Sequence, residues 1–358
     1  MKEFSCETRI VMGRNGISVL SDSKYARLMV VSDPFFAKNG WAERLGKMAR
    51  EYEIFDEVMP DPSVALVARG VARMKAFVPD SVVALGGGSA MDCAKAMVFF
   101  SGLDIPLIAV PTTSGSGSEV TDFAILTHDG VKHPLVDKKL RPKMAILEEE
   151  LLAGMPPSLV ADGGFDVLSH ALEAWVGTNA NPMTDALALE AFRRGITHLR
   201  DSFRGELSVR PALHAASTMA GLAFTQAGLG LCHAISHALG GQFHIPHGRL
   251  NAIVLPAVIG ANSQAAGAKY AALARLAGLA GSSDAMALRN LKNALARLRS
   301  DLQLPGSLAQ AGVSPAQLQE NMESIAAAAV QDPCCATNPQ PVTVDLVRRV
   351  LGEVAGRG

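Results

Sequence analysis

The sequence predicts an α/β domain built on a parallel sheet, followed by an all-helical domain. Short apolar runs alternate with helical patterns up to residue 150, which is typical of strand–helix–strand units. After Met155-Pro156-Pro157, strand-like runs almost vanish and alanine-rich helical patterns dominate. A chain of 358 residues is also long for a single core. We therefore expect two domains, residues 1–155 and residues 156–358.

The elements of the first domain follow from short apolar runs that end at turn-forming residues. Three buried strands are expected, at 27–31, 81–85 and 107–110. Three helices are expected between and around them, at 39–53, 64–77 and 90–100. Strand, helix and strand in succession imply a parallel sheet with helices on both faces. In the second domain the helical patterns are clearest at 184–199 and 265–298.

The composition indicates a cytoplasmic globular protein. Apolar residues make up 49% of the chain and charged residues 19%, so a large buried interior is expected. The net charge of −1 and the scattered Lys and Arg residues argue against a nucleic-acid partner. The five cysteines form no CxxC pair, which favours reduced thiols. No leader-like N-terminus and no apolar run of membrane-spanning length is present, so we expect neither export nor a membrane partner.

Two glycine-rich loops predict a nucleotide site. Gly86-Gly87-Gly88-Ser89 follows one expected strand and precedes a helix, where free backbone N–H groups can hold phosphate. Taken alone, a triple glycine can also be a tight turn without a ligand. The stretch from Thr112 to Glu119 is a second hydroxyl- and glycine-rich loop after a strand. Ligands of open α/β sheets bind beyond the carboxyl ends of the strands, so the two loops together favour a nucleotide.

Asp33, at the end of the first expected strand, has two interpretations. Its carboxylate can accept hydrogen bonds from a ribose diol and would repel a 2′-phosphate, which favours NAD over NADP. It can equally form an ordinary Asp-Pro turn. The sequence leaves both open.

Acidic and imidazole side chains in the second domain predict a metal site. Asp166 and His170 are four residues apart, as are His233 and His237, so each pair shares a helix face. His247 follows across a Gly240-Gly241 break. A single histidine on an apolar helix is usually a core residue, but this cluster suits a divalent first-row metal. Spacing alone selects His233 and His237 together as ligands.

With these motifs, the chain resembles the iron-containing (group III) alcohol dehydrogenases along nearly its whole length. Within that family it is most similar to the 1-propanol and ethanol dehydrogenases of propanediol and ethanolamine utilisation. Four ordered motifs carry the resemblance: Gly86–Asp92, Pro111–Glu119, Gly164–Trp175, and Gly228–Gly241 with Pro246-His247-Gly248.

The resemblance implies roles for individual residues. The family's metal ligands match Asp166, His170, His233 and His247. His237 then matches a residue beside the nicotinamide and the substrate, in contrast to the ligand role that spacing favours. The family's dinucleotide contacts match Asp33, Gly87, Gly88, Ser89, Asp92, Thr112, Thr113 and Lys132. Positions that line the family's substrate pocket match Phe224 and Cys334.

The chain departs from the family pattern at a few positions near these motifs. Asp61 stands where relatives often have asparagine, and Ala257 replaces a common histidine. Asp162 and Arg249 also stand where other residues are usual. None of the four is a matched metal ligand, so the expectation of metal binding is unchanged. Arg249 raises the alternative of an anionic substrate.

The expected activity is reversible hydride transfer between NAD(H) and a small primary alcohol or aldehyde, with His237 as proton relay. The expected metal is Fe²⁺, with Zn²⁺ as the alternative, because both accept Asp and His ligands. One alternative function is reduction of an anionic aldehyde, such as sulfoacetaldehyde or a carboxylate semialdehyde. A metal-dependent hydrolase or lyase, and a non-catalytic metal-binding protein, are further alternatives.

The resemblance also bears on assembly and location. Relatives form dimers or larger assemblies, so we expect a homodimer or a higher homo-oligomer. We expect a cytoplasmic enzyme, with encapsulation in a bacterial microcompartment as the alternative location.

Overall fold

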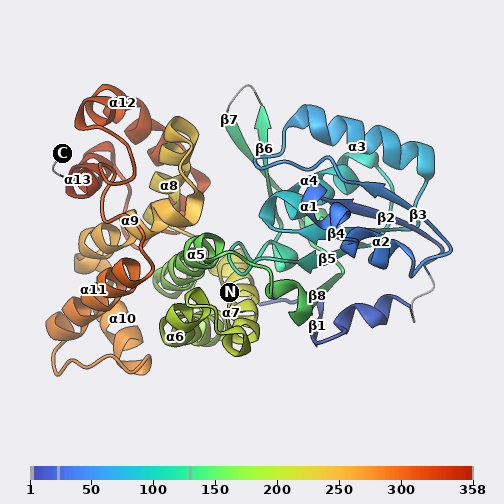
Figure 1. Ribbon diagram of the computed structural model, residues 1–358. Helices are drawn as coiled ribbons and strands as arrows, with labels where there is room; N and C mark the ends of the chain where they lie inside the picture. The colour runs from blue at the N-terminus through green and yellow to red at the C-terminus, as the bar shows by residue number, and fades with distance from the viewer. Residues whose placement is uncertain (1–3, 22–24, 129–130, 357–358) are drawn as a thin grey trace. The chain divides into compact units, whose positions relative to one another are not determined.

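The structure, a computed structural model, describes residues 4–21, 25–128 and 131–356 and divides into two compact units (Figure 1). Ser5–Met155 forms an α/β unit. The second unit begins at Pro156 and is helical, and Phe4 groups with it.

The α/β unit is built on a parallel six-stranded sheet with the strand order β1-β8-β5-β4-β2-β3. Its strands are β1 (Arg9–Gly13), β2 (Arg27–Ser32), β3 (Glu51–Phe55), β4 (Ser81–Gly86), β5 (Leu107–Pro111) and β8 (Met144–Glu148). A separate antiparallel pair consists of β6 (Phe123–His128) and β7 (Val131–Val136).

Both faces of the sheet are covered, as alternate residues of β2 show. Met29 and Val31 lie in one buried cluster with apolar residues of α3 (Val64–Phe77) and α4 (Gly88–Ser101). Leu28 and Val30 lie in a second cluster with residues of α2 (Trp41–Gly46) and the 3₁₀ helix η1 (Gly16–Leu20). A fully parallel sheet needs cover on both faces, and its strands are accordingly apolar throughout. The predicted fold class is confirmed.

One expected helix of this unit is wrong. Residues 39–53 form only the short α2, and the chain then enters β3, an edge strand that pairs with β2. The alternation of Glu51, Tyr52, Glu53 and Ile54 suits a half-exposed edge strand better than a helix. The remaining short helix is α1 (Pro34–Lys38), and the other 3₁₀ turns are η2 (Ser118–Val120), η3 (Lys138–Leu140) and η4 (Glu149–Leu152).

The second unit is helical. Its α-helices are α5 (Pro157–Val176), α6 (Pro182–Phe203), α7 (Arg210–Ala227), α8 (Leu231–Phe243), α9 (His247–Ala261), α10 (Ser263–Leu276), α11 (Asp284–Asp301), α12 (Pro315–Gln331) and α13 (Val344–Val354). Its 3₁₀ turns are η5 (Leu207–Val209) and η6 (Pro333–Thr337). The helical pattern at 265–298 is interrupted after Ala277, because Gly278 has a φ of 85° that ends α10. Among the described residues, no helix combines the length and apolar character that a membrane crossing needs.

Three helices of this unit position the predicted ligands. Asp166 and His170 lie on α5, His233 and His237 on α8, and His247 is the first residue of α9. Pro246 lies at the N-cap of α9, where its fixed φ suits a helix start. The N-cap residue of α8, Gly230, has no side chain to cap the helix, and α5 supplies one instead.

Candidate functional site

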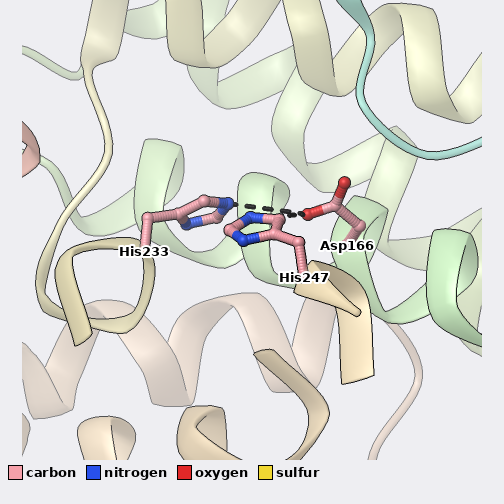
Figure 2. Close-up of side chains that lie close together, drawn as sticks. All are labelled: Asp166, His233 and His247. Carbon is pink, nitrogen blue, oxygen red and sulfur yellow. Dashed lines mark ion pairs between the residues drawn. The ribbon is translucent and has the colours of Figure 1, made fainter. Parts of the chain in front are cut away.

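A carboxylate and two imidazoles from three helices converge in the helical unit (Figure 2). Asp166, His233 and His247 each offer one ligand atom, and these atoms all lie within 4.8 Å of one another. Asp166 Oδ1 lies 3.7 Å from His233 Nε2 and 3.5 Å from His247 Nε2. Metal–ligand bonds of about 2 Å place neighbouring donors about 3 Å apart, so this spacing suits a divalent cation.

His170 adds a third imidazole on the same carboxylate oxygen. Its Nε2 lies 3.5 Å from Asp166 Oδ1, one helical turn away on α5. Its ring stacks on His233 with centroids 4.5 Å apart, and on Phe224 at 4.4 Å. The described structure therefore brings together all four predicted ligands.

Two side chains of the cluster, Asp166 and His247, have protonation states that suit metal binding. Burial raises the pKa of Asp166, but the charges of His170 and His247 and a hydrogen bond from His233 bring it below its usual value. Burial and the neighbouring imidazoles hold the pKa of His247 well below its usual range, against the attraction of Asp166. An ionised carboxylate and a neutral imidazole are the forms that bind a metal.

The pKa of His233 shifts in the opposite direction, because the imidazole lies between two carboxylates. Burial lowers its pKa, but the hydrogen bonds and charges of Asp166 and Glu173 outweigh burial and raise it to about 9. A divalent cation competes with a proton held in such a place, since metal binding requires the neutral imidazole.

Two polar side chains that sequence reasoning missed support the cluster. Glu173 Oε2 lies 2.6 Å from His233 Nδ1, and the carboxylate also accepts hydrogen bonds from the backbone N–H groups of Gly230 and Cys232. It thus caps α8 from α5 and orients a predicted ligand at once. Asn251 donates to Asp166 Oδ1 at 2.9 Å, and its Nδ2 lies 3.1 Å from His247 Nε2.

Helical spacing could have indicated both residues. Glu173 follows His170 by three positions on α5, and Asn251 follows His247 by four on α9. Such spacings place side chains on one helix face.

His237 has its own partners. Its Nδ1 lies 2.8 Å from Asp332 Oδ2, and its ring stacks on His247 with centroids 5.1 Å apart. Burial raises the pKa of Asp332, but the hydrogen bond and charge of His237 bring it down to about 2. The donor atoms of His237 group with those of Asp332 and Cys334, apart from the set that contains His233. Asp332, which sequence reasoning missed, favours the tautomer with a proton on Nδ1 and leaves Nε2 to act as acceptor.

The two predicted pocket residues lie beside these histidines. Phe224 is buried on α7 against His170. Cys334 is half-buried on η6, and its backbone N–H donates to Asp332. Burial raises the pKa of the Cys334 thiol well above its usual value, so the thiol is protonated and weakly polar.

In the α/β unit, the two glycine-rich loops pack together at the ends of β4 and β5. Gly86 pairs with Pro111 in the register, and Thr112 donates its N–H to Gly86. A Cβ on Gly87 would lie 3.1 Å from Thr113 Oγ1, so the loops approach closely. Gly87 caps α4 without a side chain, and Gly88 and Ser89 form its first turn. This arrangement presents backbone N–H groups at a helix N-terminus, as an anion site requires.

The charged residues predicted for this site have protein partners. Asp33 Oδ1 caps α1 by accepting from the N–H groups of Phe35 and Phe36, and its Oδ2 lies 3.5 Å from the place that a Cβ of Gly86 would take. Asp33 Oδ1 therefore serves the Asp-Pro turn, and Asp33 Oδ2 faces the first glycine-rich loop. Lys132 forms an ion pair with Asp61 at 2.7 Å.

Asp92 and the buried Lys95 organise the second loop from α4. Asp92 accepts hydrogen bonds from Ser118 Oγ and from the N–H of Ile125. Lys95, which is 1% exposed, donates to Ser118 Oγ and to the Thr121 and Phe123 backbone oxygens. Burial lowers the pKa of Lys95 to about 8, although nearby acids oppose the shift. Lys95 is a residue that the sequence analysis did not single out.

Comparison with known proteins gives a consistent result along the chain. Residues 7–149 match the model of the iron-containing alcohol dehydrogenases, and residues 160–354 match that of the C-terminal part of the Fe-containing alcohol dehydrogenase family. The 1-propanol dehydrogenase PduQ of Salmonella typhimurium is 38% identical over 99% of this chain and 100% of its own length. The NADPH-dependent butanol dehydrogenase of Clostridium saccharobutylicum is 34% identical over 98% of this chain and 97% of its own length. A crystal structure of a 1,3-propanediol oxidoreductase superposes with a TM-score of 0.93 at 30% identity, covering 99% of this chain and all of the other.

Proposed function

The chain belongs to the iron-containing alcohol dehydrogenase family, and we propose that it transfers hydride reversibly between NAD(H) and a small primary alcohol or its aldehyde. Propanol and propanal, or ethanol and acetaldehyde, are the expected pairs, since the similar PduQ protein is a 1-propanol dehydrogenase. The enzyme class follows from the family, and the residue roles below are proposals.

One observation carries the proposal. Three imidazoles, those of His170, His233 and His247, lie within 3.5–3.7 Å of one oxygen of Asp166. These four residues would hold Fe²⁺, with Zn²⁺ as the alternative, because imidazole and carboxylate donors suit both ions. When bound, the metal supplies a Lewis acid for the substrate oxygen, and the nicotinamide supplies or accepts the hydride.

His237 is the proposed catalytic residue of the chain itself. Asp332 holds its Nδ1, so Nε2 is oriented to pass a proton to or from the substrate oxygen. Phe224 and Cys334 would line the substrate pocket as apolar walls, which suits a short alkyl chain.

The anionic-aldehyde alternative has no support from Arg249. The guanidinium group pairs with Asp162 through two hydrogen bonds of 3.1 and 3.2 Å, so its charge is already compensated. A neutral substrate remains the proposal.

The dinucleotide would bind at the glycine-rich loops. Gly87, Gly88 and Ser89 offer the helix N-terminus to the diphosphate. The other proposed contacts are Asp33, Asp92, Thr112, Thr113 and Lys132. The coenzyme type is not fixed by the family, since one similar protein is NADPH-dependent. We propose NAD because the second oxygen of Asp33 would meet the 2′-phosphate of NADP.

Asp33→Asn tests the coenzyme proposal. The amide keeps an oxygen that can cap α1 but removes the negative charge, so kcat/KM with NADP should rise by about tenfold relative to NAD. Steady-state kinetics with both coenzymes measures the ratio, and Asp56→Asn on the same unit is the control. An unchanged ratio in Asp33→Asn would remove Asp33 from this role.

His247→Ala tests the metal centre. Loss of one of four donors should abolish metal retention and NADH-dependent reduction of propanal together, because the imidazole supplies a coordination bond. Metal content by mass spectrometry and NADH absorbance are the two measurements. His198→Ala, on α6 of the same unit, should change neither. Full turnover by metal-free His247→Ala would refute the proposal.

We also propose a homodimer or higher homo-oligomer. β1 lies at the edge of the sheet, and Met12 on it is 66% exposed, which suits pairing with a second copy. Light scattering of the purified enzyme tests this, and a monomer would contradict it. A cytoplasmic location is proposed from the free thiols of the described cysteines, with encapsulation in a microcompartment as the alternative.

A further inference from the structure

α5 and α9 carry three of the four proposed ligands and are joined by a partly buried ion pair. Arg249 Nε lies 3.2 Å from Asp162 Oδ1, and Arg249 Nη2 lies 3.1 Å from Asp162 Oδ2. The side chains are 32% and 12% exposed. Two parallel hydrogen bonds between a guanidinium and a carboxylate fix orientation as well as distance.

The pair lies next to the proposed ligands on both helices. Asp162 precedes Asp166 by one helical turn, so both project from one face of α5. Arg249 follows His247 by two residues in the first turn of α9. Neither Asp162 nor Arg249 is a member of the donor set described above.

The backbones also touch at this place. A Cβ on Gly248 would lie 1.9 Å from the carbonyl oxygen of Asp162, so the first turn of α9 rests directly on the α5 backbone. Only glycine fits there without a shift of one helix. Residue 248 has no side chain, so the neighbouring Arg249 makes a side-chain link between the two helices at this contact, in addition to the Asn251–Asp166 hydrogen bond.

We propose that the Asp162–Arg249 pair is a positioning element that sets the spacing of Asp166 and His247 and thereby the retention of the metal. The inference rests on the proposed metal centre. Coordination tolerates ligand displacements of only about 0.2 Å. A small separation of α9 from α5 therefore weakens the coordination bonds, although both ligands are still present.

The test measures metal release from the full-length, metal-loaded enzyme. Asp162→Asn, Arg249→Gln and the double variant are compared with the wild type for the rate of transfer of Zn²⁺ or Fe²⁺ to a coloured chelator. Each variant should release the metal about tenfold faster, the size of effect that residues behind metal ligands usually have. Arg249→Gln, at the more exposed end of the pair, serves if Asp162→Asn does not fold.

A second ion pair in the same unit provides the control. Arg200 on α6 binds Asp301 on α11 with Nη2–Oδ2 at 2.6 Å and Nε–Oδ2 at 2.8 Å. Arg200→Gln and Asp301→Asn remove a comparable link away from the ligands, so they should leave the release rate unchanged. Unfolding temperatures of all variants separate general loss of stability from loss of metal.

The outcomes distinguish this inference from the proposed function. Release at the wild-type rate in all three Asp162 and Arg249 variants would overturn the inference and leave the metal centre intact. Equal acceleration in the Arg200 and Asp301 variants would also overturn it, because the effect would then be general. Wild-type protein that binds no metal would refute the proposed centre itself, and this inference with it.

Discussion

At the residue scale, Glu173 shows how one buried side chain can serve both folding and function. It satisfies two backbone N–H groups at the start of α8 and holds the Nδ1 of His233 on the same helix. Because the N-cap residue of α8 is Gly230, which has no side chain to cap the helix, the same carboxylate carries both roles. One carboxylate from α5 thus orients a proposed ligand and caps the helix start, together with Asn338, which accepts from the Leu231 N–H.

Glu173→Gln should weaken metal binding without removing a ligand. The amide cannot accept from His233 and from both backbone groups as a carboxylate does, so the imidazole loses its fixed tautomer. We expect metal affinity to fall by about 10- to 100-fold, measured by competition with a chelator of known affinity. Glu190→Gln, at a half-buried position of α6 away from the ligands, is the control. Equal affinities in the two variants would contradict the prediction.

The ligand candidates could be predicted from the sequence, but their partners could not. Asp166, His170, His233 and His247 are residue types that bind metals at recognisable spacings, and the structure brings them together. Their roles stay predictions. The partners Glu173 and Asp332 lie 60 and 95 residues from the histidines they bind. The spacing from His170 could have placed Glu173 on the ligand-bearing face of α5, but no local signal pairs Glu173 with His233 or Asp332 with His237. Only the packing of α5, α8 and η6 brings these pairs together.

At the element scale, three of the four interior strands of the sheet were predicted, and the interior strand β8 and the two edge strands were not. β2, β4 and β5 are continuous apolar runs, which the environment of a central parallel strand requires. β3 alternates charged and apolar residues at the edge of the sheet, and its first residues follow directly on a helical pattern. The choice between helix and strand there depends on pairing with β2, which no local pattern records.

The second glycine-rich loop depends in the same way on a residue inside an element, Lys95 of α4. Its ammonium group binds oxygens of Ser118, Thr121 and Phe123, so hydrogen bonds from α4 hold the end of the loop and the residues that follow it. Burial destabilises the charged form of Lys95 and thereby lowers its pKa.

Lys95 should make the stability of the protein depend on pH in a predictable direction. Its pKa is about 8 in the folded state, below the ordinary lysine value of 10.5, so the unfolded state binds more protons between these limits. Its contribution to the free energy of unfolding therefore rises with pH across this window, by on the order of 3 kcal/mol. Lys95→Met removes this rise, which urea unfolding at pH 7.5 and about 10.5 measures as a difference from the wild type.

Lys75→Met is the matched control for this comparison. Lys75 is exposed on the neighbouring helix α3, so its replacement should leave the pH profile parallel to that of the wild type. A parallel profile for Lys95→Met as well would show that the buried ammonium does not titrate in this window.

At the scale of the whole molecule, the two units would carry different ligands. The glycine-rich loops that suit a dinucleotide belong to the α/β unit, and the carboxylate–imidazole cluster belongs to the helical unit. The change of hydrophobic period along the chain predicts this division, because the two architectures have different periods. It has a thermodynamic consequence, since a ligand stabilises the structure that binds it.

Metal and coenzyme should therefore protect different segments against amide hydrogen exchange. A ligand at 100 times its Kd stabilises its binding state by about 2.7 kcal/mol, which slows the opening that exposes local amides. Chelation should speed exchange in α5, α8 and the first turn of α9, where the proposed ligands lie. NAD should slow exchange at residues 86–92 and 112–118, and His247→Ala should abolish the effect of metal while keeping that of NAD. If chelation left α8 unchanged and altered residues 86–92 instead, the assignment of the metal to the helical unit would be wrong.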